Sequence, residues 1–202
     1  MQYSYLYMYY SFNKNLIENI VPEKPEQIWV SDITYVGNRQ NPMYLALVTD
    51  AYSKQIMGYK LASHMKVSLC ADALKMAIKN RKYPNLKLIH HSDRGIQYCN
   101  PGYTQFAEQN GLTLSMTEQY DPYENAVAER INRTLKYEYG LKQSIKNTTL
   151  AKKIVKRAVN IYNNLRPHLS LELFTPKHVH LNQNVTYKCY RRNKQNLQYL
   201  TI

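Results

Sequence analysis

Three β-rich runs follow one another closely in residues 28–61, and helical and strand-like segments alternate after them. The runs IWVSDITYV, MYLALVTD and KQIMGYKL are rich in β-branched and aromatic residues, and short polar breaks separate them. Strands that are so close in sequence pair most economically as an antiparallel meander. The pattern therefore predicts a sheet whose first three strands, at 28–36, 43–50 and 54–61, are antiparallel.

Helical periodicity begins after the third run, where apolar residues recur at the spacing of one helix face. Prolines and a glycine then mark the starts and ends of further short segments. The expected elements are a helix at 66–79, a strand at 86–90, a helix at 101–109, a strand at 112–115 and helices near 124–139 and 149–164. A meander followed by such alternation predicts an α/β fold, in which helices flank a mixed five-stranded sheet.

The chain has 202 residues, which is enough for one well-packed domain with short tails. We expect an N-terminal arm or linker at 1–25, the core domain at 26–180 and a basic C-terminal extension at 181–202. No apolar run approaches about 18 residues and the start lacks the pattern of a signal peptide, so neither membrane insertion nor secretion is expected.

The charge balance is strongly basic, with 27 Lys and Arg against 14 Asp and Glu, a net charge of +13. Such a surface attracts polyanions, and nucleic acid is the first candidate, although an ordinary basic protein is an open alternative. The three cysteines, Cys70, Cys99 and Cys189, are an odd number without CxxC spacing. This pattern argues against a disulfide framework and against a cysteine zinc site.

A carboxylate interrupts the first β-rich run at Asp32. Strand alternation puts Asp32 on the same face as Val30 and Thr34, where an unpaired carboxylate costs several kcal/mol or is forced neutral. A divalent cation compensates such a charge, and Mg²⁺ prefers one or two carboxylates together with water and phosphate oxygens. The alternative is an ion pair with a structural Lys or Arg, and Asp32 taken alone favours that alternative.

Two further acids stand at positions that suit a site. Asp93 follows an apolar run within HHSDRGIQY, near the carboxyl end of a strand, where open α/β sheets bind ligands. Its alternative role is that of a turn or cap residue beside Gly95. Glu129 shares one helix face with Arg133 and Lys136, opposite an apolar face. The alternative for this group is a solvated polar face.

Six blocks, in order, carry a family resemblance: WVSDITYV, YLALVTD, HHSDRGIQY, ENAVAER, LKYE and YNNLRPHLSLELFTP. With the separations of 61 positions from Asp32 to Asp93 and 36 from Asp93 to Glu129, the chain resembles the transposase catalytic subunit of IS3-type insertion sequences, relatives of retroviral integrases. The resemblance extends from about Asn15 to about His180. It implies a ribonuclease-H-like fold and a DDE active site in which these three acids are the catalytic residues and metal ligands.

The resemblance also implies an activity. Two Mg²⁺ or Mn²⁺ ions, with Asp32 shared between them, would serve the metal-dependent cleavage of DNA phosphodiesters and the strand transfer of a 3′-hydroxyl during transposition. The expected partners are transposon-end and target DNA, further copies of the chain in a homo-oligomer on DNA, and a separate helix-turn-helix protein or region. The expected location is the prokaryotic cytoplasm, at the nucleoid.

Four basic residues are candidate DNA ligands: Arg133, Lys136, Arg94 and Arg166. His91, Gln97 and Tyr98 flank Asp93, and we assign them no catalytic step. Basic residues between Lys152 and Arg157 fit DNA, a partner subunit or a solvated face. The turn near Gln119 and Tyr120 lacks an expected glycine, which questions the geometry of that loop. Two alternatives stay open: a related ribonuclease-H-like nuclease and a catalytically inactive DNA-binding remnant.

Overall fold

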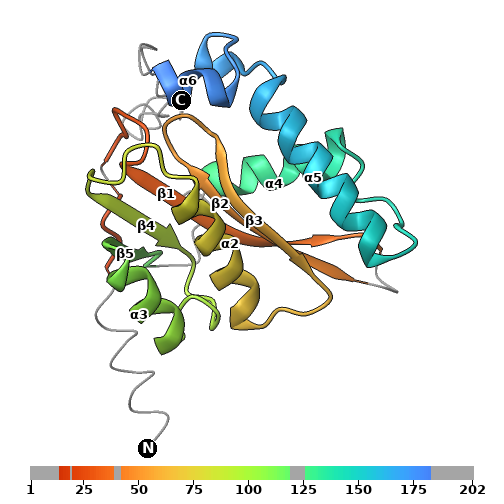
Figure 1. Cartoon of the computed structure of the whole chain (residues 1–202), viewed down its shortest axis with the longest axis horizontal. Helices are drawn as coiled ribbons and strands as arrows, with labels where there is room; N and C mark the ends of the chain where they lie inside the picture. Colours follow the sequence, from red (N-terminus) through yellow and green to blue (C-terminus); the bar gives the residue numbers. More distant parts are fainter. Residues whose placement is uncertain (1–13, 19, 39–41, 119–125, 183–202) are drawn as a thin grey trace, which may run out of the picture.

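A computed structural model of the chain describes residues 14–18, 20–38, 42–118 and 126–182. Its sheet has five strands in the order β3-β2-β1-β4-β5 (Figure 1). The strands are β1 (Ile28–Val36), β2 (Met43–Asp50), β3 (Ile56–Ala62), β4 (Leu88–Ser92) and β5 (Leu112–Met116). The helices are α2 (Val67–Lys79), α3 (Pro101–Gln109), α4 (Ala126–Glu138), α5 (Thr148–Asn164) and α6 (Pro176–Asn182), with a 3₁₀ turn, η2 (Leu169–Leu171).

The sheet is mixed, as the sequence predicts. Strand β2 is antiparallel to β1 and to β3, whereas β4 is parallel to β1 and to β5. The third strand begins at Ile56, two residues later than predicted, because Lys54 has a φ of 63° in the tight turn after β2. The fourth strand begins at Leu88 and continues to Ser92, because its pairing with β1 extends to Ser31.

Helices cover both faces of the sheet. On one face, α2 and α3 pack on a core that includes Trp29 and Val48, and on the other face α4 and α5 pack on Leu45 and Leu47. Figure 1 shows α2 in front of the strands and α4 behind them. The contact with α2 is close at Gly58, where an added Cβ would lie 2.1 Å from a backbone oxygen of α2.

A buried polar network fastens α6 to the core. Ser53 Oγ lies 2.9 Å from His180 Nδ1, and His180 Nε2 lies 3.4 Å from Glu26 Oε1. Arg81 Nε donates to Glu26 Oε2 at 3.0 Å, and the Asp50 carboxylate accepts from Ser53 and from the backbone of Glu26. All five side chains are buried, so the network joins segments that are up to 154 positions apart in sequence.

Among the described residues, no helix combines the length and the apolar character needed to span a bilayer. Cys70 and Cys99 are buried and form no disulfide within the described residues, and Cys189 lies outside the described ranges. The turn at Gln119 and Tyr120, the predicted arm up to residue 13, and the predicted extension beyond residue 182 lie outside them as well.

Candidate active site

The parallel pairing of β1 with β4 brings two of the three predicted acids to one level of the sheet. Ser31 pairs with Ser92 at the end of the ladder. Asp32 and Asp93 each follow this pair by one residue, and adjacent strands are about 4.8 Å apart. The register therefore makes them neighbours at the carboxyl end of β4, an edge where α/β sheets bind ligands.

The Asp32 carboxylate lies in a half-buried setting on the α4 side of the sheet. Its Oδ1 accepts a hydrogen bond from Ile33 N at 2.8 Å, and its Oδ2 accepts one from Asn132 Nδ2 at 2.6 Å. Burial and the nearby charge of Asp93, with a smaller effect from Glu129, raise the pKa of Asp32 to about 6, although the two hydrogen bonds act against the rise. The three acids thus interact electrostatically.

Asp93 is exposed and begins the loop after β4. Its Oδ1 accepts a hydrogen bond from Gly95 N at 3.0 Å. This bond is the turn role that the sequence offered as an alternative for Asp93. A Cβ at Gly95 would lie 2.9 Å from this oxygen. A glycine at this position therefore leaves room for the Asp93 carboxylate beside Asp32.

Helix α4 presents Glu129 in its first turn, exposed to solvent. One turn later Asn132 is buried, and it makes the hydrogen bond to Asp32. Residues three apart are neighbours on a helix surface, so this bond holds the Glu129 turn of α4 beside β1. Sequence reasoning missed Asn132. The sequence did contain a signal for it, because an amide side chain stands beside the apolar residues Ala128, Ile131 and Leu135 on the buried face of the helix.

The donor set suits a hard divalent cation. Among the residues that the structure describes, no three His, Cys, Asp or Glu side chains form a group that can hold a metal ion as they stand. The chemistry of the three carboxylates nevertheless fits Mg²⁺ or Mn²⁺, which prefer oxygen ligands. Burial and like charges already disfavour the ionised form of Asp32, and a bound cation would relieve that penalty.

The residues that flank Asp93 are occupied by structural contacts. Burial lowers the pKa of His91 to about 4, and its Nδ1 lies 2.8 Å from Ser115 Oγ. Gln97 Nε2 donates to Met65 O at 2.9 Å, and Tyr98 is buried. These contacts account for His91, Gln97 and Tyr98 without a catalytic step.

The four candidate DNA ligands differ in their surroundings. Arg133 is exposed and Lys136 half-buried, one and two turns after Glu129 on α4. Arg166 makes two hydrogen bonds to the Glu138 carboxylate, at 2.8 and 2.7 Å, and Arg94 donates to a backbone oxygen. The guanidinium groups of Arg94 and Arg166 are therefore already engaged, whereas Arg133 faces solvent. The basic residues Lys152, Lys153, Lys156 and Arg157 of α5 are all exposed.

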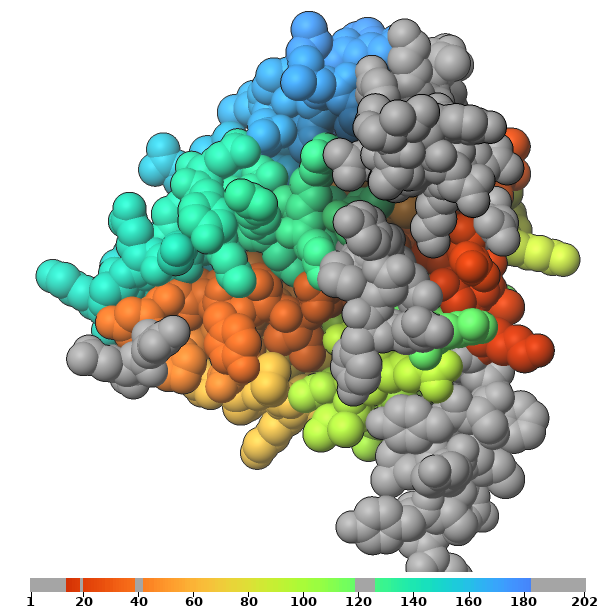
Figure 2. Space-filling view, turned by 180° about the vertical axis from the view of Figure 1, so that it is seen from behind, coloured from red at the N-terminus to blue at the C-terminus, as the bar shows by residue number. Residues whose placement is uncertain are grey.

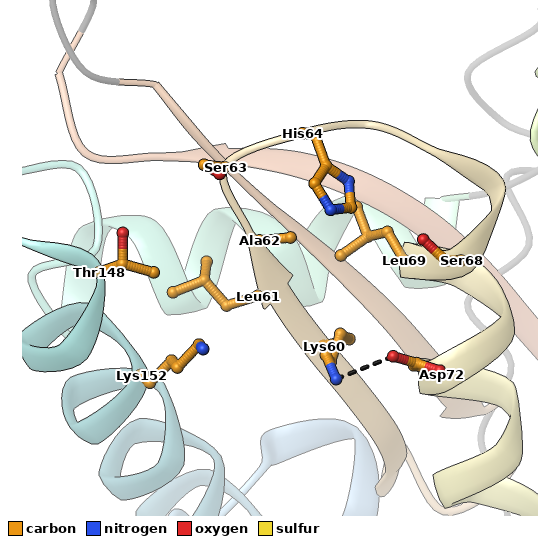
Figure 3. Close-up of a pocket in the computed structure, with 10 residues that line it drawn as sticks. All are labelled: Lys60, Leu61, Ala62, Ser63, His64, Ser68, Leu69, Asp72, Thr148 and Lys152. Carbon is orange, nitrogen blue, oxygen red and sulfur yellow. Dashed lines mark ion pairs between the residues drawn. The ribbon is translucent and has the colours of Figure 1, made fainter.

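A surface pocket of about 320 Å³ lies elsewhere, between β3, α2 and the start of α5 (Figure 3). Its lining includes His64, Thr148 and Lys152, and Lys60 pairs with Asp72 across 2.8 Å. None of the three predicted catalytic acids lines this pocket. The carboxylate edge of the sheet is therefore the better candidate for the chemistry.

Comparison with known proteins identifies the family of the chain. The integrase core domain model matches residues 22–122, and a second integrase core domain model matches residues 110–176. The "Insertion element IS600 uncharacterized 31 kDa protein" of Shigella sonnei is 36% identical over 162 residues, which are 80% of this chain and 59% of that protein. The transposase for insertion sequence element IS629 of the same organism is 36% identical over 146 residues, or 72% of this chain and 49% of that protein. The chain thus spans less than two thirds of the length of either relative.

The fold is also similar to that of a solved integrase domain. The catalytic core domain of HTLV-2 integrase, solved in complex with magnesium, superposes with a TM-score of 0.61 at 16% identity, over 78% of this chain and 97% of that one. This likeness confirms the predicted ribonuclease-H-like fold. The matches of the family models cover the sheet and α4, and the chain therefore belongs to the integrase core domain family.

Proposed function

We propose that the chain is the catalytic domain of an insertion-sequence transposase of the DDE type, which cuts DNA phosphodiesters and joins a freed 3′-hydroxyl to target DNA. The observation that carries the proposal is the β1–β4 register together with the bond from Asn132 to Asp32, which bring the three acids to one edge of the sheet, where burial and the other two charges raise the pKa of Asp32. Perturbed carboxylates of this kind are typical of catalytic sites. The IS629 relative, named a transposase, supports the same activity.

The proposed metal ligands are Asp32, Asp93 and Glu129, which would together hold two Mg²⁺ or Mn²⁺ ions. Bound there, the ions would activate the attacking oxygen, stabilise the leaving oxygen and offset charge on the phosphoryl group. The magnesium complex of HTLV-2 integrase supports this choice of metal. The fold would supply the three carboxylates from β1, from the loop after β4 and from the first turn of α4.

Asn132 has a positioning role in this scheme. Its 2.6 Å hydrogen bond fixes one oxygen of Asp32, and the Ile33 amide fixes the other. Hydrogen bonds of this kind orient metal ligands, and their loss typically lowers metal affinity by about 10- to 100-fold. Arg133 and Lys136, on the same helix as Glu129, would hold DNA phosphates near the reacting one.

The proposed partners follow from the activity. They are the ends of the element and its target DNA, further copies of the chain in a homo-oligomer that pairs two ends, and a separate helix-turn-helix protein or region that recognises the end sequence. The net charge of +13 favours DNA as the main ligand. The proposed location is the prokaryotic cytoplasm, at the nucleoid.

The purified chain tests the proposal in a strand-transfer assay with Mg²⁺ or Mn²⁺. Donor oligonucleotides copy the sequences that flank the gene, and a supercoiled plasmid serves as target. The wild type should nick and join, and Asp32→Asn, Asp93→Asn or Glu129→Gln should each abolish both steps. Asp72→Asn is a matched control, because Asp72 pairs with Lys60 on the opposite side of the sheet.

Three results would contradict parts of the proposal. Strand transfer that persists in Asp32→Asn would remove the assigned site. Metal-dependent nicking without joining would favour a related nuclease. DNA binding without either reaction, in a folded wild-type protein, would favour an inactive DNA-binding remnant.

A further inference from the structure

An exposed aromatic ring at the end of α4 holds two cationic side chains. Tyr137 is 63% exposed and lies eight residues after Glu129, two turns along the same helix. The Arg133 guanidinium carbon lies 5.9 Å from the Tyr137 ring centroid, and Lys142 Nζ lies 4.8 Å from it. Cations within about 6 Å of a ring centroid are attracted to the negative face of the ring. Lys142 Nζ also donates to Tyr137 Oη at 3.4 Å, so Tyr137 contacts both cationic side chains.

The backbone beneath this pair is well fixed. Lys142 N donates to Lys136 O at 3.2 Å, which closes the loop onto the end of α4. The neighbouring Leu141 is buried, and its carbonyl oxygen accepts from Gly37 N at 2.9 Å, just beyond β1. Lys142 consequently projects from a loop that is tied to the sheet.

The two cations are not neutralised within the described part of the chain. Neither Arg133 nor Lys142 makes an ion pair there, and the nearby Glu138 carboxylate is occupied by Arg166. Two like charges beside one ring, without an acid between them, favour an anionic ligand. Figure 2 shows α4 and α5, in green to cyan, at the surface over the strands, so a long ligand can reach this region.

We propose that Arg133, Tyr137 and Lys142 form a phosphate clamp, which binds the sugar-phosphate backbone of DNA a few nucleotides from the reacting phosphate. This inference rests on the proposed function for its choice of DNA. Eight residues of helix span about 12 Å. Because one strand of duplex DNA rises about 3.4 Å per nucleotide, the Tyr137 end of the clamp contacts the backbone about three or four nucleotides from the reacting phosphate.

The phosphate clamp is tested by equilibrium binding to a fluorescent duplex in EDTA, where no metal-dependent cleavage occurs. Each of Arg133→Gln and Lys142→Gln should reduce the slope of log affinity against log salt by about one. Tyr137→Leu keeps both charges but removes the ring, and it should weaken binding by about 3- to 10-fold. Lys142→Gln should cost less affinity in the Tyr137→Leu background than in the wild type, because the ring no longer positions the lysine.

Matched controls separate the phosphate clamp from general charge and folding effects. Lys79→Gln removes one exposed lysine at the end of α2, on the other face of the sheet, and Tyr35→Leu removes a tyrosine that is 58% exposed and whose ring contacts Tyr44. Both should bind DNA as the wild type does. Thermal unfolding of each variant confirms that the protein has folded.

Neutral linkages locate the contact along the DNA. Methylphosphonates placed three or four nucleotides from the reacting phosphate should weaken wild-type binding and leave Lys142→Gln nearly unaffected. If Tyr137→Leu and Lys142→Gln both bind with wild-type affinity and salt slope, or if their effects are fully additive, the phosphate clamp is refuted.

Failure of the phosphate clamp and failure of the proposed function give different results. A wild type that cuts and joins DNA, with Tyr137→Leu binding normally, refutes the phosphate clamp alone. A wild type without strand transfer, in which the three clamp variants still show the expected losses, refutes the transposase activity and supports the phosphate clamp.

Discussion

Replacing Asp32 with asparagine should stabilise the metal-free protein. The raised pKa of about 6, against an ordinary value of 3.8, means that the folded chain holds this proton more tightly than the unfolded chain does. The folded state therefore loses stability as the pH rises from 3.8 through 6, because Asp32 must ionise beside Asp93. Asparagine has no charge to bury, so the variant escapes this loss.

The magnitude follows from the pKa difference of about two units. At about 1.4 kcal/mol per unit, the full effect above pH 7 is about 3 kcal/mol. An asparagine Oδ1 can still accept from Ile33 N. In the native protein Asn132 Nδ2 donates to Asp32, and Asn132 Oδ1 has no partner among the described residues. In the variant the Asn132 amide must turn over, so that its Oδ1 accepts a hydrogen bond from the new asparagine Nδ2. Allowing for imperfect geometry, we expect a gain of about 1–3 kcal/mol.

Urea denaturation in EDTA measures this difference, at pH 8 and at pH 5. The gain at pH 5 should be roughly half of that at pH 8, because Asp32 is then largely protonated in the folded wild type. Burial, and for His90 also the neighbouring His91, lowers the pKa of these histidines to about 3 and about 4. Acid therefore destabilises wild type and variant alike, and only their difference reports on Asp32. A variant that is less stable at pH 8, or a gain that does not shrink at pH 5, would refute the reasoning.

Three further predictions concern metal binding and packing. Added Mg²⁺ should raise the melting temperature of the wild type but not that of Asp32→Asn, and an equal rise in both would show that the metal binds elsewhere. Gly58→Ala should cost about 3 kcal/mol or more in urea denaturation, because its Cβ would lie 2.1 Å from Ala73 O, and an unchanged midpoint would contradict this contact. His180→Ala should cost about 2–3 kcal/mol, since it removes the contacts with Ser53 and Glu26 and leaves a cavity where the buried ring lay, and wild-type stability would mean that the network is dispensable.

The strands and helices could be predicted because their signals are local. Apolar alternation and helical spacing depend only on neighbouring residues, and the structure confirms the five strands and the mixed sheet. The start of β3 was wrong by two residues because the positive φ of Lys54 belongs to a turn that the β-rich pattern does not reveal. Element ends depend on such turns, so they are harder to predict than the elements themselves.

The candidate site was less accessible to physical reasoning from sequence. Taken singly, Asp32, Asp93 and Glu129 each favoured an ordinary structural role, and only the family resemblance joined them. The register of β1 with β4, and the bond from Asn132 across 100 positions, become visible only in the folded chain. The ion pair between Arg166 and Glu138 also forms only in the folded chain. Nothing in the pattern of basic residues distinguishes Arg166 from Arg133.

Asp32, Asp93 and Glu129 are proposed to hold two divalent cations at one edge of the sheet. Anomalous diffraction from crystals soaked in Mn²⁺ tests this proposal most directly, because manganese scatters anomalously and carboxylates bind it well. We expect manganese peaks at coordination distance from the Asp32 and Asp93 carboxylates, with the Glu129 carboxylate turned toward them. Manganese bound only at other positions, with this edge of the sheet empty at saturating Mn²⁺, would contradict it.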